Sequence, residues 1–246
     1  MSAREDFLSH GWCSARGVLD SQSVGDAREN VARYVSDVVP EIDSSFTYFE
    51  DRERPETLKQ MQMMHEHDGW FAALAAKGPI PLLAELLLGE PVVLKNVQYF
   101  SKPPRESRPT PPHQDGRYFM IEPMRAVALW LALDPVDKSN GCVRYVSGSH
   151  WLPLRSHART DVLGFSQGIT DFGAEDRERE YACTAAPGDV LAHHAGTIHR
   201  ADENTSDRFR RAIGFVYYGA SAQEDTERHA AYQRSLHDDL SRRGRI

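Results

Sequence analysis

The sequence predicts a mainly β (α+β) fold, a barrel or jelly roll preceded by a helical N-terminal third. The spacing of apolar residues is helical up to Gly89 and becomes strand-like directly after it, in the segment PVVLKNVQYF. Short β-branched and aromatic runs then recur as far as about residue 220, with the turn signals Asn140-Gly141 and Pro187-Gly188 between them. Short strands at this density are typical of barrels and double-sheet folds.

The N-terminal part, about residues 1–90, is expected to be helical. Ser23 can cap a helix in which apolar residues recur from Val24 to Val35, before Pro40 interrupts it. A second helix is expected at Pro55–Met64. A third begins at Pro79, which suits a first helical turn, and ends at Gly89, which suits a left-handed C-terminal cap.

The β core is expected at about residues 91–220, in strands at Val92–Phe100, Ala126–Leu133, Cys142–Val146, Tyr181–Thr184, Asp189–His193 and Arg211–Tyr218. The proline-rich segment 102–112 cannot be a central strand, because proline lacks the amide that a ladder needs. The polar segment 152–180 predicts a long insertion of the kind that often lines binding sites. A solvated C-terminal helix is expected at about 226–243, and the whole chain, 1–246, is interpreted as one domain.

Composition restricts the class of partner. The chain of 246 residues has a formal net charge of −7, so we expect no nucleic acid and no membrane as partner, and a small-molecule substrate instead. Its three cysteines are far apart and predict neither a disulfide framework nor a thiolate zinc site. The N-terminus lacks the apolar core of a signal peptide, so a cytoplasmic location is expected. The oligomeric state stays open.

A possible metal centre begins at His113 and Asp115. If this segment is extended, residues two apart point to the same face, where an imidazole and a carboxylate can share a metal. A third ligand is expected from a later strand, and spacing alone leaves His193, His194 and His199 as candidates. Two histidines and one carboxylate bind one face of iron(II) and leave positions for a bidentate 2-oxo acid and for O2. Zinc could use the same ligands.

The segments 113–119 (HQDGRYF), 140–150, 186–194 and 199–213 resemble the phytanoyl-CoA dioxygenase family of iron(II)- and 2-oxoglutarate-dependent oxygenases. In that family a distal histidine ligand is followed eleven residues later by an arginine, the spacing of His199 and Arg210. The resemblance therefore implies a double-stranded β-helix, or cupin-like jelly roll, with helices packed on it. It also implies iron(II) bound by His113, Asp115 and His199, with Arg210 binding the distal carboxylate of 2-oxoglutarate. A guanidinium suits this role because its donors form a fixed fork.

The resemblance extends to Lys102–Pro104 and Ala128–Leu133, and implies further co-substrate contacts at Gln98, Trp130, Lys102 and, by a looser match, Lys59. The sequence departs from the family at two places. Ala201 replaces a frequent serine or threonine, and Ser147 replaces a usual proline. The other two candidate ligands, His193 and His194, are interpreted as strand residues, one directed inward and one outward.

The expected reaction is hydroxylation of a small-molecule metabolite of specialised metabolism, with release of succinate and CO2. The carboxylate of Asp115 argues against halogenation, since the resembling halogenases have a small residue there. Desaturation, epoxidation or cyclisation stays open, as do a cupin-like zinc enzyme and a non-catalytic binding protein. Basic residues outnumber acidic ones between positions 95 and 125, which predicts either a solvated loop or a positive entrance for an anionic substrate.

Overall fold

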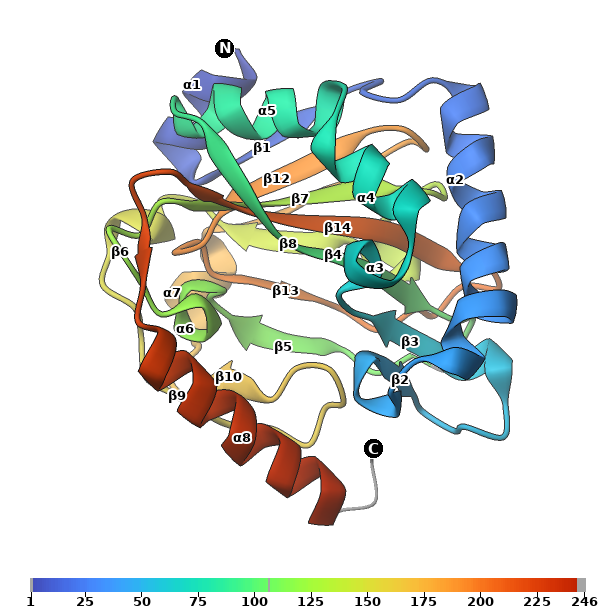
Figure 1. Ribbon diagram of the computed structural model, residues 1–246. Coiled ribbons are helices and arrows are strands. Elements are labelled where there is room, and N and C mark those ends of the chain that lie inside the picture. Colours follow the sequence, from blue (N-terminus) through green and yellow to red (C-terminus); the bar gives the residue numbers. More distant parts are fainter. Residues whose placement is uncertain (1, 106, 243–246) are drawn as a thin grey trace.

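The computed structural model describes residues 2–105 and 107–242. Its two main antiparallel sheets lie one above the other in Figure 1, and two further sheets have only two strands each. The larger sheet has the strand order β1 (Trp12–Ala15), β12 (Val190–His194), β7 (Ala126–Ala132), β14 (Arg210–Gly219), β4 (Val92–Lys102), β3 (Leu58–Met61) and β2 (Thr47–Phe49). The smaller has the order β11 (Glu180–Ala182), β8 (Val143–Val146), β13 (His199–Ala201) and β5 (Thr110–His113). The expected jelly-roll core with N-terminal helices is confirmed.

Helices of the N-terminal third cover the outer face of the larger sheet (Figure 1). They are α1 (Ala3–His10), α2 (Ser21–Arg33), α3 (Met64–His67), α4 (Gly69–Ala76) and α5 (Pro79–Leu88). Among the described residues, no single helix is long and apolar enough to cross a membrane. The helices α4 and α5 reach that length only as a pair bent by 43°, and α5 buries five residues in the core.

Each central strand of the larger sheet separates two cores, because alternate side chains point to opposite faces. On β7, Leu129 and Leu131 pack with the helices, whereas Trp130 and Ala132 join a second cluster with residues of the smaller sheet. On β14, odd-numbered residues such as Ile213 pack with the helices in the same way. Even-numbered residues of β7 and β14 therefore face the space between the sheets.

The structure corrects several expected elements. The helix α2 begins at Ser21 and is capped by Asp20, whose carboxylate accepts the Ser23 amide, so Ser23 is not the cap. The helix expected at Pro55–Met64 is wrong: a 3-10 turn at Pro55–Thr57 leads into β3. All four residues of β3 are buried, and pairing with β2 and β4 outweighs their helical propensity.

The remaining expectations are close to the structure. The helix α5 ends at Gly89 with φ 72°, and Gly141 and Gly188 also have positive φ. The six expected strands all occur, with ends shifted by one or two residues. The insertion 152–180 contains β9 (His157–Arg159), β10 (Gln167–Ile169) and α7 (Ala174–Glu178), and the last helix, α8, spans Thr226–Arg242. Residue 243, the expected end of that helix, lies outside the described residues. The other short elements are α6 (Gly116–Phe119), β6 (Ile121–Glu122) and β15 (Gln223–Glu224).

Candidate metal centre and co-substrate site

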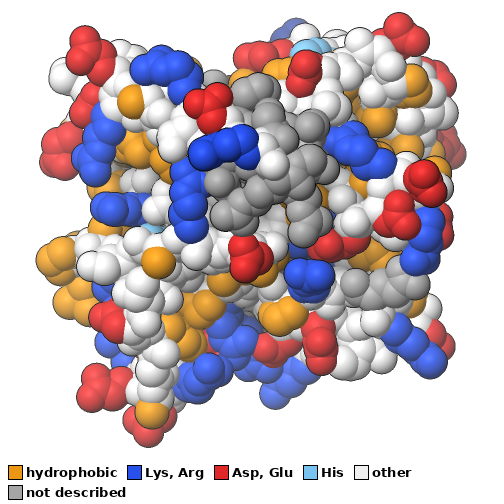
Figure 2. Space-filling model, turned by 90° about the horizontal axis from the view of Figure 1, so that it is seen from below, with side chains coloured by type: hydrophobic (Ala, Val, Ile, Leu, Met, Phe, Trp, Pro, Cys, Tyr) orange, Lys and Arg blue, Asp and Glu red, His pale blue; other side chains and the backbone are white. Residues whose placement is uncertain are grey.

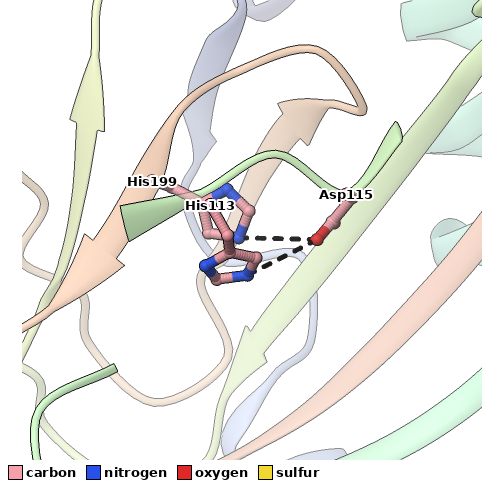
Figure 3. A group of neighbouring side chains, drawn as sticks. All are labelled: His113, Asp115 and His199. Carbon is pink, nitrogen blue, oxygen red and sulfur yellow. Dashed lines mark ion pairs between the residues drawn. The ribbon is translucent and has the colours of Figure 1, made fainter. Parts of the chain in front are cut away.

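His113, Asp115 and His199 come together at one end of the smaller sheet (Figure 3). His113 is the last residue of β5 and lies directly opposite His199 of β13 in the ladder. Asp115 does not continue the strand, since it has helical φ and ψ (−59° and −33°) and precedes α6. The extended H-x-D geometry expected from the sequence is therefore wrong. The chain turns after His113, and this turn brings the carboxylate back toward both imidazoles.

Backbone contacts orient both imidazoles. Nδ1 of His113 is 2.8 Å from the Pro111 carbonyl oxygen, and Nδ1 of His199 is 3.0 Å from that of Thr197. A carbonyl can only accept, so each neutral ring carries its proton on Nδ1 and directs the Nε2 lone pair inward. The two Nε2 atoms lie 3.6 and 3.7 Å from Oδ1 of Asp115. One ligand atom from each residue lies within 4.8 Å of the others, which fits a single metal ion.

Burial sets the protonation states of this cluster. It lowers the pKa of His113 and that of His199, so both rings are neutral at neutral pH, as a metal ligand requires. Burial alone would raise the pKa of Asp115, but the nearby His199 and a hydrogen bond from His193 outweigh it and hold the carboxyl below its usual range. The cluster therefore offers two neutral nitrogens and one carboxylate.

Arg210 begins β14 on the face toward the smaller sheet. It is almost fully buried, its Cζ lies 5.1 Å from the centroid of the Trp130 ring, and its Nε has no hydrogen-bond partner. Burial lowers its pKa to about 10, so it is still charged at neutral pH. Its neighbour Arg211 points to the other face, where Nε and an Nη donate to Asp134 at 2.8 Å each. Among the described residues, no carboxylate pairs with Arg210.

Lys102 is a second buried cation beside Arg210, and the two residues are partners in the β4–β14 ladder. Its Nζ donates to the Arg108 carbonyl oxygen at 2.6 Å, and no ion pair is found for it within residues 2–105 and 107–242. Burial and the charge of Arg210 lower its pKa well below the usual value. Arg210 is charged and has no carboxylate partner among the described residues, and an anion bound beside it would also favour the charged form of Lys102, so the two residues form a site suited to an anion.

One cavity of about 1330 Å³ connects these groups. It is lined by the histidine–aspartate cluster, by Arg210 and by the other four predicted contact residues, Lys59, Gln98, Lys102 and Trp130. Gln98 accepts a hydrogen bond from Gln60 at 3.0 Å, and Lys59 pairs with Glu50 at 3.2 Å. Gly214 also lines the cavity. A Cβ there would lie 2.7 Å from the Phe100 ring, so glycine keeps this part of the cavity open.

Two further residues lie at the site: His193, which was interpreted as a strand residue, and Tyr232, which had no recognisable signal in the sequence. His193 of β12 lies with its Nε2 3.0 Å from Oδ2 of Asp115, whereas His194 faces outward toward Phe7 of α1. The helix α8 also reaches the cavity, where the Tyr232 and Ser166 hydroxyls lie 2.6 Å apart. Most described residues of α8 are exposed, as expected for a solvated helix, but Tyr232 also contacts the cavity wall. Each of these contacts joins residues more than sixty positions apart.

Comparison with known proteins agrees with this geometry. The structure superposes with a TM-score of 0.72 on the non-heme alpha ketoglutarate dependent epimerase SnoN from nogalamycin biosynthesis, at 25% identity over 89% of this chain and 83% of that chain. A second structure of SnoN contains Fe3+, alpha ketoglutarate and nogalamycin RO. EctD from S. alaskensis shares the fold, with a TM-score of 0.73 at 20% identity over 90% of this chain and 78% of that chain.

The fold and the site are similar to those of 2-oxoglutarate-dependent non-haem iron enzymes. Within that class, the chain belongs to the phytanoyl-CoA dioxygenase family, whose model matches residues 7–212. The phytanoyl-CoA dioxygenase domain-containing protein 1 of Bos taurus is 29% identical over 157 residues, which are 62% of this chain and 54% of that protein. The peroxisomal phytanoyl-CoA dioxygenase of Bos taurus is 30% identical over 56% of this chain and 42% of its own length. The chain spans about half the length of these curated relatives.

Proposed function

We propose that the chain is an iron(II)- and 2-oxoglutarate-dependent dioxygenase that hydroxylates a small molecule and releases succinate and CO2. The observation that carries the proposal is the presence, in one cavity, of a three-ligand cluster and a buried arginine without a carboxylate partner. A zinc hydrolase would use the same ligands but would not need the buried cation. In a non-catalytic binding protein, nothing would require the ligand cluster to be intact.

In this proposal each residue has a defined role. His113, Asp115 and His199 hold iron(II), and the bound iron with 2-oxoglutarate and O2 supplies an oxidant that removes hydrogen from carbon. Arg210 and Lys102 hold the distal carboxylate of 2-oxoglutarate, because burial strengthens both the charge attraction and the hydrogen bonds. Gln98 and Trp130 shape the walls beside it, and Lys59 lies further along the cavity with its charge paired to Glu50.

The charges of the cavity suggest which ligand is an anion. Three other cations that line it are paired with carboxylates: Lys59 with Glu50 at 3.2 Å, Lys95 with Glu224 at 2.9 Å, and Arg200 with Glu180 at 2.9 Å. On the face seen from below in Figure 1, basic and acidic side chains are interspersed (Figure 2). Arg210 and Lys102 are buried and have no carboxylate partner among the described residues, so we infer that the anion bound beside them is the co-substrate.

The size of the cavity bears on the substrate as well. At about 1330 Å³ it exceeds the roughly 300–1,000 Å³ of ordinary small-molecule sites. Amides and aromatic rings also line the cavity, including Gln60, Gln62, Asn96, Tyr48 and Phe165. These groups suit a large substrate with both apolar rings and hydroxyl or carbonyl groups, of the kind that specialised metabolism makes.

The test is anaerobic addition of iron(II) and 2-oxoglutarate to the metal-free protein. A weak visible charge-transfer band is expected, and it should be absent in His199→Ala. Succinate should then form in air, faster with a substrate than without. Binding of zinc but not of 2-oxoglutarate would favour the hydrolase, and a band without succinate for any substrate would favour the binding protein.

The reaction type needs a separate measurement, since the similar structures include an epimerase and a carbocyclase. Mass spectrometry of the product separates the alternatives. Hydroxylation and epoxidation add one oxygen, desaturation and cyclisation remove two hydrogens, and epimerisation leaves the mass unchanged. A product without added oxygen would contradict the proposed hydroxylation and leave the oxygenase class intact.

A further inference from the structure

The side chain of His193 lies against the candidate metal ligands without being one of the three. It projects from β12 into the space between the sheets and is almost fully buried. Its ring centroid is 4.1 Å from that of His199, and its Nε2 is 3.0 Å from Oδ2 of Asp115. A third buried imidazole at this distance is not needed for a two-histidine, one-carboxylate site, and therefore requires its own explanation.

The two carboxylate oxygens of Asp115 have different neighbours. Oδ1 lies 3.6 Å from Nε2 of His113 and 3.7 Å from Nε2 of His199, on the side where the three ligand atoms converge. Oδ2 points away from this position, toward His193. A carboxylate held in this way presents one oxygen to a metal and keeps the other in a hydrogen bond.

The direction of that hydrogen bond follows from the carboxylate of Asp115, which can only accept, so Nε2 of His193 donates to it. On the other side of the ring, the Tyr145 hydroxyl of β8 lies 3.2 Å from Nδ1 of His193, and no other hydrogen bond of this hydroxyl is found within the described residues. A phenol can donate to Nδ1, which supports the tautomer with the proton on Nε2. The Tyr145 ring is itself fully buried and stacked on Trp12, with ring centroids 5.5 Å apart, so the phenol is held in place.

Asp115 needs such support, because little else restrains its side chain. Asp115 precedes the four-residue helix α6, and its side chain makes no capping hydrogen bond to the backbone of that helix. Apart from the two candidate ligands His113 and His199, the only hydrogen-bond or ion-pair partner of its carboxylate in the described part of the chain is His193.

We propose that His193 is a positioning residue: with Tyr145 behind it, His193 holds Asp115 as a one-oxygen metal ligand. This inference rests on the proposed function, because it assumes that His113, Asp115 and His199 bind a metal. Partners that orient a ligand from behind contribute typically 10–100-fold to metal affinity. His193 thus acts through Asp115 and not as a fourth ligand.

The experiment is anaerobic titration of the metal-free protein with Co(II), which reports affinity and coordination through its visible absorption bands. In His193→Phe the dissociation constant should rise by about 10–100-fold, and the bands should change as Asp115 becomes free to bind through both oxygens. In His193→Gln, whose amide can still donate to Asp115, both affinity and spectrum should return close to those of the parent. Tyr145→Phe should weaken binding less than His193→Phe does.

Two results would overturn the inference. One is unchanged affinity and spectrum in His193→Phe. The other is loss of binding in His193→Gln as complete as in His199→Ala, which would make His193 a ligand. Thermal unfolding of each metal-free variant checks that the variant folds. If His193→Phe does not fold, the other two variants test the inference: affinity for Co(II) should be nearly retained in His193→Gln and reduced in Tyr145→Phe. Failure of the parent protein to bind Co(II), or binding by His199→Ala as tight as the parent's, would instead refute the proposed function.

Discussion

Arg210 and Arg211 show how the environment of a single residue decides its role. They are adjacent on β14 and therefore point to opposite faces. Arg211 donates two hydrogen bonds to Asp134, which identifies it as a structural residue. Arg210 is buried beside Trp130 and Lys102 with an unpartnered Nε, which is costly in the ligand-free protein and favourable once a carboxylate binds.

The two arginines form a matched pair of variants. In Arg210→Gln we expect the dissociation constant of 2-oxoglutarate to rise by about 10–100-fold, because a charge-assisted hydrogen bond contributes roughly 1.5–3 kcal/mol. In Arg211→Gln the dissociation constant of 2-oxoglutarate should be unchanged, whereas the free energy of unfolding should fall by about 1 kcal/mol, because Asp134 loses the guanidinium but keeps Arg28 and the backbone amide of residue 211. Anaerobic titration with 2-oxoglutarate and urea unfolding measure the two quantities. Weaker 2-oxoglutarate binding in Arg211→Gln alone would contradict the assignment.

His194 gives a prediction about pH. Burial, with a smaller contribution from His150, lowers its pKa to about 4, and Nδ1 accepts the Gly196 amide at 3.0 Å. The folded pKa lies below the unfolded value of about 6.5. Acid therefore protonates the unfolded chain first, and the stability from this residue is complete above pH 6.5 and is lost as the pH falls toward 4.

His194→Asn keeps an acceptor for the Gly196 amide but removes the titration. The loss of unfolding free energy between pH 6.5 and pH 4 should be smaller in the variant than in the parent, by about 1–3 kcal/mol after allowance for partial exposure. The other buried histidines titrate in the same direction, so the difference between the two proteins is the quantity to measure. Equal pH dependence in chemical unfolding would show that His194 is not responsible.

Among the elements, α8 connects the C-terminal part of the chain to the cavity. Tyr232 bonds to Ser166 at 2.6 Å and packs edge-on against Tyr118 of α6, with ring centroids 6.2 Å apart. Arg159 of β9 donates to Ser235 at 2.9 Å. The insertion and α8 thus contact each other at the cavity wall through these hydrogen bonds.

Removing the bond between α8 and the insertion should loosen both segments. In Tyr232→Phe we expect backbone amides of α8 to exchange hydrogen about fivefold faster, which corresponds to a net hydrogen bond of about 1 kcal/mol. Ser166→Ala removes the same bond from the other side and should have the same effect, and the double variant should add nothing further. Hydrogen-exchange mass spectrometry measures the rates, and additive effects of the two changes would argue against this contact.

For the whole molecule, the proposed ligands come from both sheets. His113 and His199 belong to the smaller sheet and Arg210 to the larger one. Metal and co-substrate bound between the two sheets would connect them, and this binding site exists only in the folded protein. Binding should therefore stabilise the entire fold and not just one loop.

Thermal unfolding with and without ligands tests this coupling. Co(II) at 100 times its dissociation constant should stabilise the protein by about 2.7 kcal/mol, and 2-oxoglutarate should add a further increment. The stabilisation by Co(II) should vanish in His199→Ala. In Arg210→Gln the stabilisation by Co(II) should remain, and only the further stabilisation by 2-oxoglutarate should vanish. An equal Co(II) effect in His199→Ala would indicate that the metal binds elsewhere.

The sequence alone determined the features that depend on local pattern. The α5 end at Gly89 and the strands after it follow from propensity and turn chemistry, whereas the eleven-residue step from His199 to Arg210 follows from the family resemblance. That step placed one metal ligand and the candidate co-substrate residue before any tertiary contact was known. The jelly roll followed from the same pattern together with the family resemblance.

Only the tertiary structure decided what depends on distant contacts. The helix expected at Pro55–Met64 became β3 because β2 and β4 pair with it, and Asp115 reached the imidazoles through a turn and not along a strand. His193 lies 78 residues from Asp115, and Tyr232 lies 66 from Ser166. Local preferences of about 1 kcal/mol cannot specify such pairs, since packing and burial across the whole chain outweigh them.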